Sequence, residues 1–158
     1  MKKGIIGLVI VFIIAIVWVR LNPPLQYGTV SGNEQGTIFV VGLGNNGFTN
    51  VDLTEINVNN GEHPEEAKVQ INNPDQGFVI TDDFSAPEVA AYQFVDVADV
   101  SIAKGTDIGE LYERQDNDDV QADEKIYGLT ISHEQPIHSG IIHYRYLGMP
   151  YTLEVHAM

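Results

Sequence analysis

IIHYRYLGMPYTLEV, residues 141–155, alternates apolar and polar side chains on both sides of a turn that contains glycine and proline. A period of two is typical of strands with one buried face, so this stretch predicts two strands. Gly148-Met149-Pro150 predicts the turn that joins them into a hairpin. The apolar residues that share one phase are Ile142, Tyr144, Tyr146, Tyr151, Leu153 and Val155. Because the tyrosines keep the phase of the aliphatic residues, we expect them in the core and not in an exposed contact strip.

Upstream of this hairpin the chain contains further short runs with strand character. Alternating or β-branched apolar residues occur at 37–43, 51–58, 69–71, 78–80, 94–102 and 127–131. Possible helix caps at 85–88 and 106–107 predict only brief helices. About eight short strands with frequent Gly, Asn and Pro turns predict a mostly β, immunoglobulin-like two-sheet sandwich.

The N-terminus has a different composition, with an uncharged apolar run from Gly4 to Val19 between Lys3 and Arg20. Sixteen helical residues span about 24 Å, slightly less than a hydrocarbon core of about 30 Å. Lys3 and Arg20 can snorkel, and Trp18 suits the headgroup boundary, so the run predicts a membrane-spanning helix. A cleaved signal peptide is disfavoured because bulky and charged residues, not small ones, follow the run.

Charge sets the expected orientation. Residues 21–158 carry all 22 acidic residues against five Lys and Arg, whereas two lysines precede the apolar run. The positive-inside rule then predicts a single-pass protein of the cell membrane, with the N-terminus in the cytoplasm. The predicted segments are a cytoplasmic stub (1–3), an anchor (4–21), a tether (22–36) and an extracytoplasmic sandwich domain (37–158).

The composition of the outer domain excludes several classes of partner and chemistry. A strongly acidic domain repels nucleic acid and anionic headgroups, so we expect no nucleic-acid partner. The chain has no cysteine, which excludes disulfides, thiol nucleophiles and Cys-ligated zinc. The stability of the domain must therefore come from its core.

Gly42-Leu43-Gly44-Asn45-Asn46-Gly47 matches the G-x-G-x-x-G spacing of dinucleotide-binding loops. In that motif the glycines lead into a helix, but residues 48–58 alternate as a strand does. No acidic residue ends a strand about 20 residues later, where a ribose would be bound. We interpret the glycines as a loop that requires positive φ.

The segment 116–124 is the densest acidic patch. Calcium binds several oxygen ligands at about 2.3–2.6 Å, which acidic side chains can supply. The candidate ligands are Asp116, Asp118, Asp119, Asp123 and Glu124. The segment lacks the central glycine and the spaced D-x-D-x-D register of a helix-loop-helix calcium site. The pattern favours a solvated loop and leaves calcium as the one cofactor to test.

Histidines offer another possible metal site, with His133 and His138 as the candidates. They are five residues apart, and Pro136 prevents a helix that would bring both rings to one side as in H-E-x-x-H. Surface histidines are therefore favoured. For nucleophilic catalysis, His138 and Ser139 are neighbours on an extended chain and point apart, and no G-x-S-x-G elbow exists.

The sequence thus predicts a membrane-anchored extracytoplasmic domain with a non-catalytic binding or accessory role and no required cofactor. Its expected partners are membrane lipid, through the N-terminal helix, and a membrane or envelope protein. Two alternatives remain open, a calcium-binding surface domain that uses segment 116–124 and a histidine-metal hydrolase.

Overall fold

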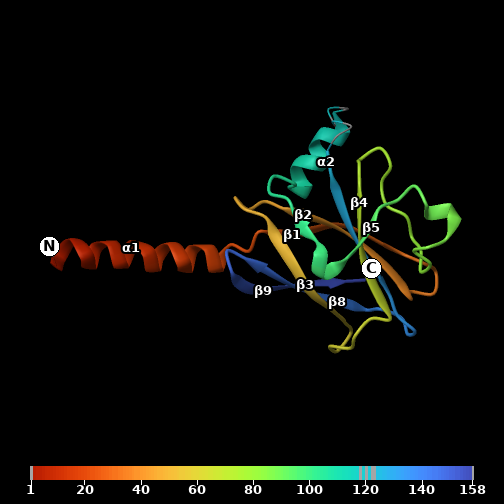
Figure 1. The fold of residues 1–158 in the computed structure, drawn as a ribbon, viewed down its shortest axis with the longest axis horizontal. Helices are drawn as coiled ribbons and strands as arrows, with labels where there is room; N and C mark the ends of the chain where they lie inside the picture. The colour runs from red at the N-terminus through yellow and green to blue at the C-terminus, as the bar shows by residue number, and fades with distance from the viewer. Residues whose placement is uncertain (1, 118, 120, 122–123, 158) are drawn as a thin grey trace.

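The computed structural model describes residues 2–117, 119, 121 and 124–157, and within these residues a long helix precedes two antiparallel sheets packed face to face (Figure 1). Sheet A contains, in spatial order, β1 (Leu25–Gly32), β2 (Ile38–Asn45), β7 (Ile126–Ser132), β4 (Glu66–Asn72) and β5 (Phe94–Asp96). Sheet B contains β6 (Ser101–Ile102), β3 (Val51–Val58), β8 (Ser139–Tyr146) and β9 (Met149–His156). The prediction of a mostly β, two-sheet sandwich is confirmed.

The predicted hairpin is formed by β8 and β9, which pair from Ser139–His156 to Tyr146–Met149. Its turn consists of Leu147 and Gly148, both with positive φ (52° and 75°), as in the tight turns that match the strand twist. The predicted turn at 148–150 is therefore displaced, because Met149 and Pro150 already belong to β9. Pro150 is tolerated there since β9 is an edge strand.

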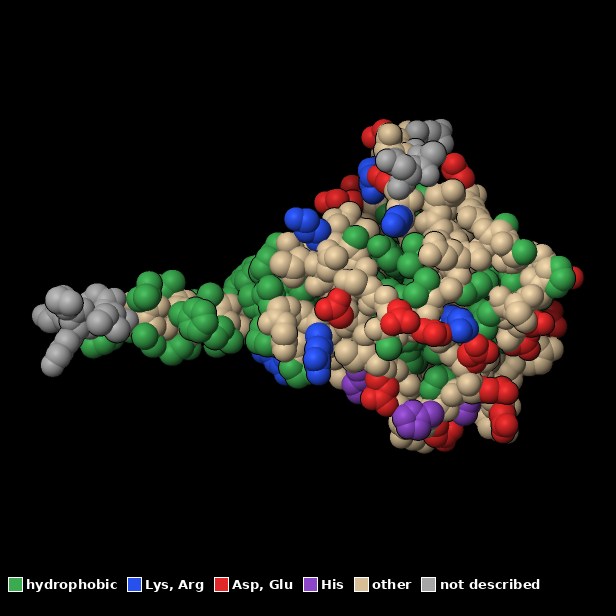
Figure 2. All heavy atoms as spheres, in the orientation of Figure 1, with side chains coloured by type: hydrophobic (Ala, Val, Ile, Leu, Met, Phe, Trp, Pro, Cys, Tyr) green, Lys and Arg blue, Asp and Glu red, His purple; other side chains and the backbone are tan. Residues whose placement is uncertain are grey.

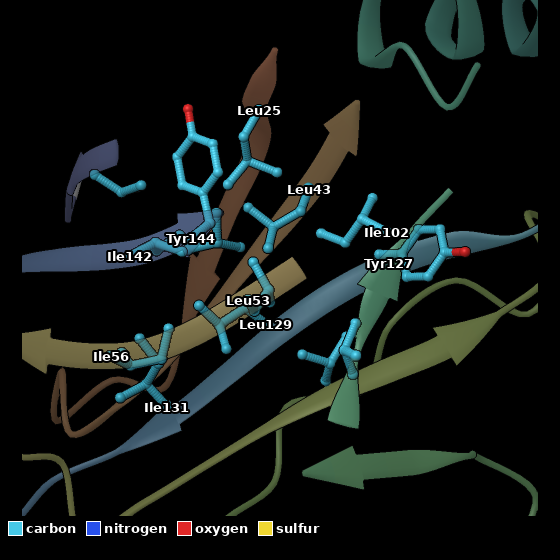
Figure 3. Packing of buried hydrophobic residues seen from close by; sticks show 14 of the residues in the cluster. Leu25, Leu43, Leu53, Ile56, Ile102, Tyr127, Leu129, Ile131, Ile142 and Tyr144 are labelled. Carbon is cyan, nitrogen blue, oxygen red and sulfur yellow. The ribbon is translucent and has the colours of Figure 1, made fainter. Parts of the chain in front are cut away.

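The core lies between the two sheets, as Figure 3 shows for Leu43, Leu129 and Ile131 of sheet A facing Leu53 and Ile142 of sheet B. The in-phase tyrosines of the hairpin belong to this core, as predicted. The rings of Tyr144 and Tyr151 stack with centroids 5.4 Å apart, and all three tyrosines of the predicted stripe are buried. The alternation in the sequence thus reports burial against the opposite sheet.

Two predicted strands differ in the structure. The run 94–102 is divided into β5, a 3-10 turn (η2, Val97–Asp99) and β6, because the chain crosses here from the edge of sheet A to the edge of sheet B. Residues 78–80 form a loop, since the backbone of Val79 bonds to the side chain of Gln70 instead of to a strand. Another short turn, η1 (Pro87–Val89), lies in the same β4–β5 connection.

The N-terminal helix α1 (Lys2–Leu21) extends away from the sandwich (Figure 1). In the part of the chain that the structure describes, no helix combines the length and the apolar character required to cross a membrane. The predicted tether is mostly ordered: only residues 22–24 separate α1 from β1, which pairs with β2. Leu25 and Val30 of β1 contribute to the core, which explains why this segment forms a strand.

Candidate functional site

The outer face of sheet A, the face turned away from sheet B, carries a group of glycines. Gly42 of β2 pairs directly with Gly128 of β7, and Gly44 lies two residues further along β2. A Cβ atom on Gly128 would lie 2.5 Å from the ring of Phe78, and one on Gly44 would lie 2.3 Å from the carbonyl oxygen of Thr106. These strands therefore need glycine because other parts of the chain pack directly on the sheet backbone.

This arrangement corrects our interpretation of the G-x-G-x-x-G motif. Residues 42–45 belong to β2 and do not form a loop, and Gly42, Gly44 and Gly47 have no positive φ. The glycines are required by close approach and not by backbone conformation.

The short helix α2 (Ile108–Asp116) covers one side of this glycine-rich surface. Its start is the predicted cap, where the Asp107 carboxylate accepts a hydrogen bond from the Glu110 backbone N–H at 3.0 Å. Ile108 is buried against Gly28 and Gly44. The Tyr112 hydroxyl accepts a hydrogen bond of 2.7 Å from the Thr29 backbone N–H. These contacts attach α2 to β1 and β2.

The β4–β5 loop covers the other side. The buried Gln70 side chain donates to the Val79 carbonyl oxygen at 2.7 Å and accepts from the Val79 N–H at 3.0 Å. Asn72 donates to the Gly77 carbonyl oxygen at 2.9 Å. Two amide side chains of β4 thereby fix the loop segment that carries Phe78, whose ring lies over Gly128.

Between α2 and this loop lies a cavity of about 420 Å³, which is within the usual size range of small-molecule sites. Figure 2 shows apolar side chains exposed in the region beneath α2. The apolar walls are formed by Pro74, Phe78, Ile108, Leu111, Tyr112 and Ile126. The cavity is thus mainly apolar, and the backbone of the glycine-rich strands contributes to its lining.

Polar groups gather at one part of the lining, where Arg114, Glu124 and Lys125 line the cavity. Arg114 forms an ion pair with one carboxylate oxygen of Glu124. The other oxygen, Oε2, is buried and has no hydrogen-bond partner within the described residues. A buried carboxylate oxygen is costly when it lacks a donor, so a rotation of the Glu124 side chain that turned this oxygen into the cavity would let a bound molecule supply one.

The predicted calcium ligands occupy different environments near this cavity. Asp116 is the last residue of α2, Asp119 is exposed, and Glu124 is paired with Arg114. Asp118 and Asp123 lie outside the described residues. Across the described ranges, no three His, Cys, Asp or Glu side chains are close enough together to hold a metal ion. Calcium binding by segment 116–124 remains a prediction.

The two candidate histidines lie beside the turn that follows β3. His133 Nε2 is 3.0 Å from the Glu62 carboxylate, and His138 is exposed and donates its backbone N–H to Asn59 Oδ1. His133 therefore has one carboxylate partner, whereas the polar contact of His138 uses its backbone. A histidine-metal hydrolase also remains a prediction.

The predicted anchor residues all belong to α1. Trp18 is exposed, and the side chain of Lys3 is outside the described set. The Arg20 guanidinium lies 4.7 Å from the centroid of the Tyr151 ring and donates to the Pro150 carbonyl oxygen. Arg20 thus contacts the β8–β9 hairpin in addition to ending the apolar run.

The cavity was not predicted from the sequence. A usable signal was present, namely Gly42 at the end of the predicted strand 37–43, Gly44 two residues later and Gly128 in the 127–131 run, since strand glycines mark close backbone approach. Comparisons with protein-family models, with curated proteins and with solved structures found no match to this chain.

Proposed function

We propose that this protein is a membrane-anchored, non-catalytic binding domain that takes a small, mainly apolar ligand in the cavity beneath α2. The observation that carries the proposal is this cavity of about 420 Å³, with apolar walls and one buried carboxylate oxygen that has no donor among the described residues. Cavities of this kind provide affinity through apolar burial and orientation through a few polar groups. The ligand class is an apolar molecule that carries one N–H or O–H donor for Glu124.

The strand order supports a finer description of the scaffold as immunoglobulin-like. Without the short strands β5 and β6, the order β1-β2-β7-β4 faces β3-β8-β9. In chain order this is the arrangement of strands A, B, E and D against C, F and G in constant-type immunoglobulin domains. Such sandwiches commonly bind their partners through elements outside the core, and α2 and the β4–β5 loop are elements of this type.

The anchor is the second part of the proposal. Apolar side chains on several sides of α1 are exposed, including those of the successive residues Leu8, Val9 and Ile10. Exposure of this much apolar surface to water is unfavourable by about 25 cal/mol per Å². Because the apolar run is shorter than a hydrocarbon core, the span requires Lys3 and Arg20 to snorkel at its two ends. The acidic domain would then lie outside the cytoplasm.

Titration of the full chain in nanodiscs with indole tests the binding proposal. Indole has an apolar ring system and one N–H donor, and methyl NMR signals from Ile108, Leu111 and Ile126 report contact with it. We expect saturable shifts of these signals and binding about tenfold weaker for N-methylindole, which lacks the donor.

Two variants of α2 make this experiment specific. Leu111→Trp fills the cavity and should abolish the shifts of the Ile108 and Ile126 signals, whereas Glu113→Trp adds the same ring at an exposed position and should leave those shifts unchanged. Equal binding by both variants, or equal affinity for indole and N-methylindole, would contradict the proposed ligand class.

A further inference from the structure

The connection between α1 and the sandwich is short, and hydrogen bonds hold it at both ends. Asn22 ends α1 by donating its side-chain amide to the Trp18 carbonyl oxygen at 2.8 Å, and two prolines follow. The Tyr151 hydroxyl donates to the Val19 carbonyl oxygen at 3.2 Å. The Asn46 backbone N–H donates to the Pro24 carbonyl oxygen at 3.1 Å. Since both ends of the connection are held, one particular end of the sandwich adjoins the helix.

That end carries exposed apolar side chains from three separate elements. Trp18 of α1 is 59% exposed, Phe48 of the β2–β3 loop 56% and Leu147 of the β8–β9 turn 47%. Trp18 and Phe48 line one shared hollow at the junction. The Phe48 loop is held in place, because its backbone N–H donates to the Tyr146 hydroxyl at 3.2 Å. Leu147 directly follows Tyr146 and shares a turn with Gly148, so its exposed position is fixed by the hairpin.

The charge distribution is uneven along the same axis. On the face shown in Figure 2, the side chains next to α1 are apolar and basic, whereas acidic side chains lie over the middle and the opposite end of the sandwich. Arg20 lies at this junction beside Tyr151, and Arg145 is exposed on the neighbouring strand β8. Aromatic and leucine side chains flanked by arginines are typical of surfaces that enter the headgroup region of a bilayer.

We infer that the β2–β3 loop and the β8–β9 turn insert Phe48 and Leu147 into the interfacial layer of the bilayer that α1 enters. The inference rests on the proposed membrane anchor. The occupant is lipid because the exposed surface continues directly from the apolar surface of α1, with only residues 22–24 between helix and sandwich. The two inserted side chains and the hydrogen-bonded connection would together hold the sandwich in one orientation, with the end that adjoins α1 toward the membrane.

The single tryptophan of the chain permits a direct test in zwitterionic nanodiscs that contain lipids brominated near the headgroup. Quenching of Trp18 in the natural chain reports the anchor itself. In a Trp18→Phe background, Phe48→Trp and Leu147→Trp report the two proposed contacts. The control is Ile80→Trp, at an exposed position of the β4–β5 loop, which lies on the side of the sandwich away from α1 (Figure 1).

We expect quenching of about twofold for Trp18, Phe48→Trp and Leu147→Trp and none for Ile80→Trp, because only the first three lie at headgroup depth. Quenching of Trp18 without quenching of Phe48→Trp and Leu147→Trp would overturn the inference and leave the anchor intact. A blue-shifted but unquenched Phe48→Trp would identify a protein contact instead of lipid and would also overturn it. Absence of Trp18 quenching would reject the anchor and, with it, this inference.

Discussion

The two sheets differ in what covers their outer faces. In sheet A the outward residues of β2 and β7 are as buried as the inward ones, and the outward positions include Val40, Gly42 and Thr130. In sheet B burial alternates along β8 and β9, and the outward positions include His143, Arg145 and Glu154. Sheet A therefore lies between sheet B on one side and α2 with the β4–β5 loop on the other, whereas the outer face of sheet B is exposed to solvent.

This difference locates the candidate site. An apolar cavity needs walls on two sides, and the covered face of sheet A, with α2 and the β4–β5 loop upon it, provides them. The wet face of sheet B offers polar pairs such as His143 with Asn57, 2.8 Å apart, that satisfy one another. Substitutions on the two outer faces should therefore have unequal effects, although both faces lie on the same sandwich.

The largest difference is expected between Gln70→Ala on sheet A and Asn57→Ala on sheet B. Gln70 is buried and bonds to both backbone groups of Val79, so its loss should destabilise the fold by about 3 kcal/mol. Asn57 is partly solvated, and its loss should cost less than about 0.5 kcal/mol. Urea unfolding of the full chain in detergent measures both, and amide exchange at Val79 should accelerate only in Gln70→Ala. Similar costs for the two variants would contradict the layered description.

A second difference of about 2 kcal/mol is expected between two glycines. A Cβ atom on Gly128, on the covered outer face of sheet A, would lie 2.5 Å from the Phe78 ring, whereas one on Gly140 of β8, which faces the shared core, would meet Ile131 at an ordinary 3.6 Å. Gly128→Ala should therefore destabilise the fold, and Gly140→Ala should be neutral or stabilise it through reduced unfolded-state entropy.

A double variant tests the cause of the Gly128 effect. Adding Phe78→Ala to Gly128→Ala removes the crowded ring, so the combined cost should be smaller than the sum of the two single costs. Additive costs would show that Gly128 is needed for another reason.

The same contrast explains which parts of the fold were predictable. The β8–β9 hairpin has one wet face, so its alternation could be read directly from the sequence, down to the buried tyrosines. In β2 both faces are buried, and a strand of this kind reads as a continuous apolar or small-residue run. Gly42 and Gly44 were therefore assigned to a loop, because the layer that makes them necessary comes from distant residues.

The cavity was unpredictable for a related reason. It is formed by a helix, a loop and a strand backbone that are separated in the chain, and no single segment carries its pattern. The helix itself was predicted as a short capped turn from Thr106-Asp107, but its packing on Gly28 and Gly44 depends on tertiary structure. The strand-like run 78–80 was misassigned because a side chain, Gln70, takes the place of a neighbouring strand.

The smallest expected effect on stability comes from a residue in the core between the two sheets. The Tyr144 hydroxyl is buried and has no well-formed hydrogen bond within the described part of the chain, although the Leu25 backbone is nearby. Tyr144→Phe removes this unpaired group and should stabilise the fold by about 1 kcal/mol. Tyr146→Phe is the matched control, because that hydroxyl accepts a bond from the Phe48 N–H and its removal should destabilise the fold.

The pH dependence of stability separates this cause from a general packing effect. Burial raises the pKa of Tyr144 to about 12, from a usual value of 10.0. The unfolded chain therefore ionises first, so the contribution of the neutral Tyr144 is fully present below pH 10.0 and is lost as the pH rises toward 12. Unfolding free energies measured at pH 9 and above should fall more steeply for the natural chain than for Tyr144→Phe, since phenylalanine cannot ionise. If the unfolding free energies of the natural chain and of Tyr144→Phe fell equally with rising pH, the Tyr144 hydroxyl would have to reach solvent or a hydrogen-bond partner. The core between the sheets would then be accessible to water at this position.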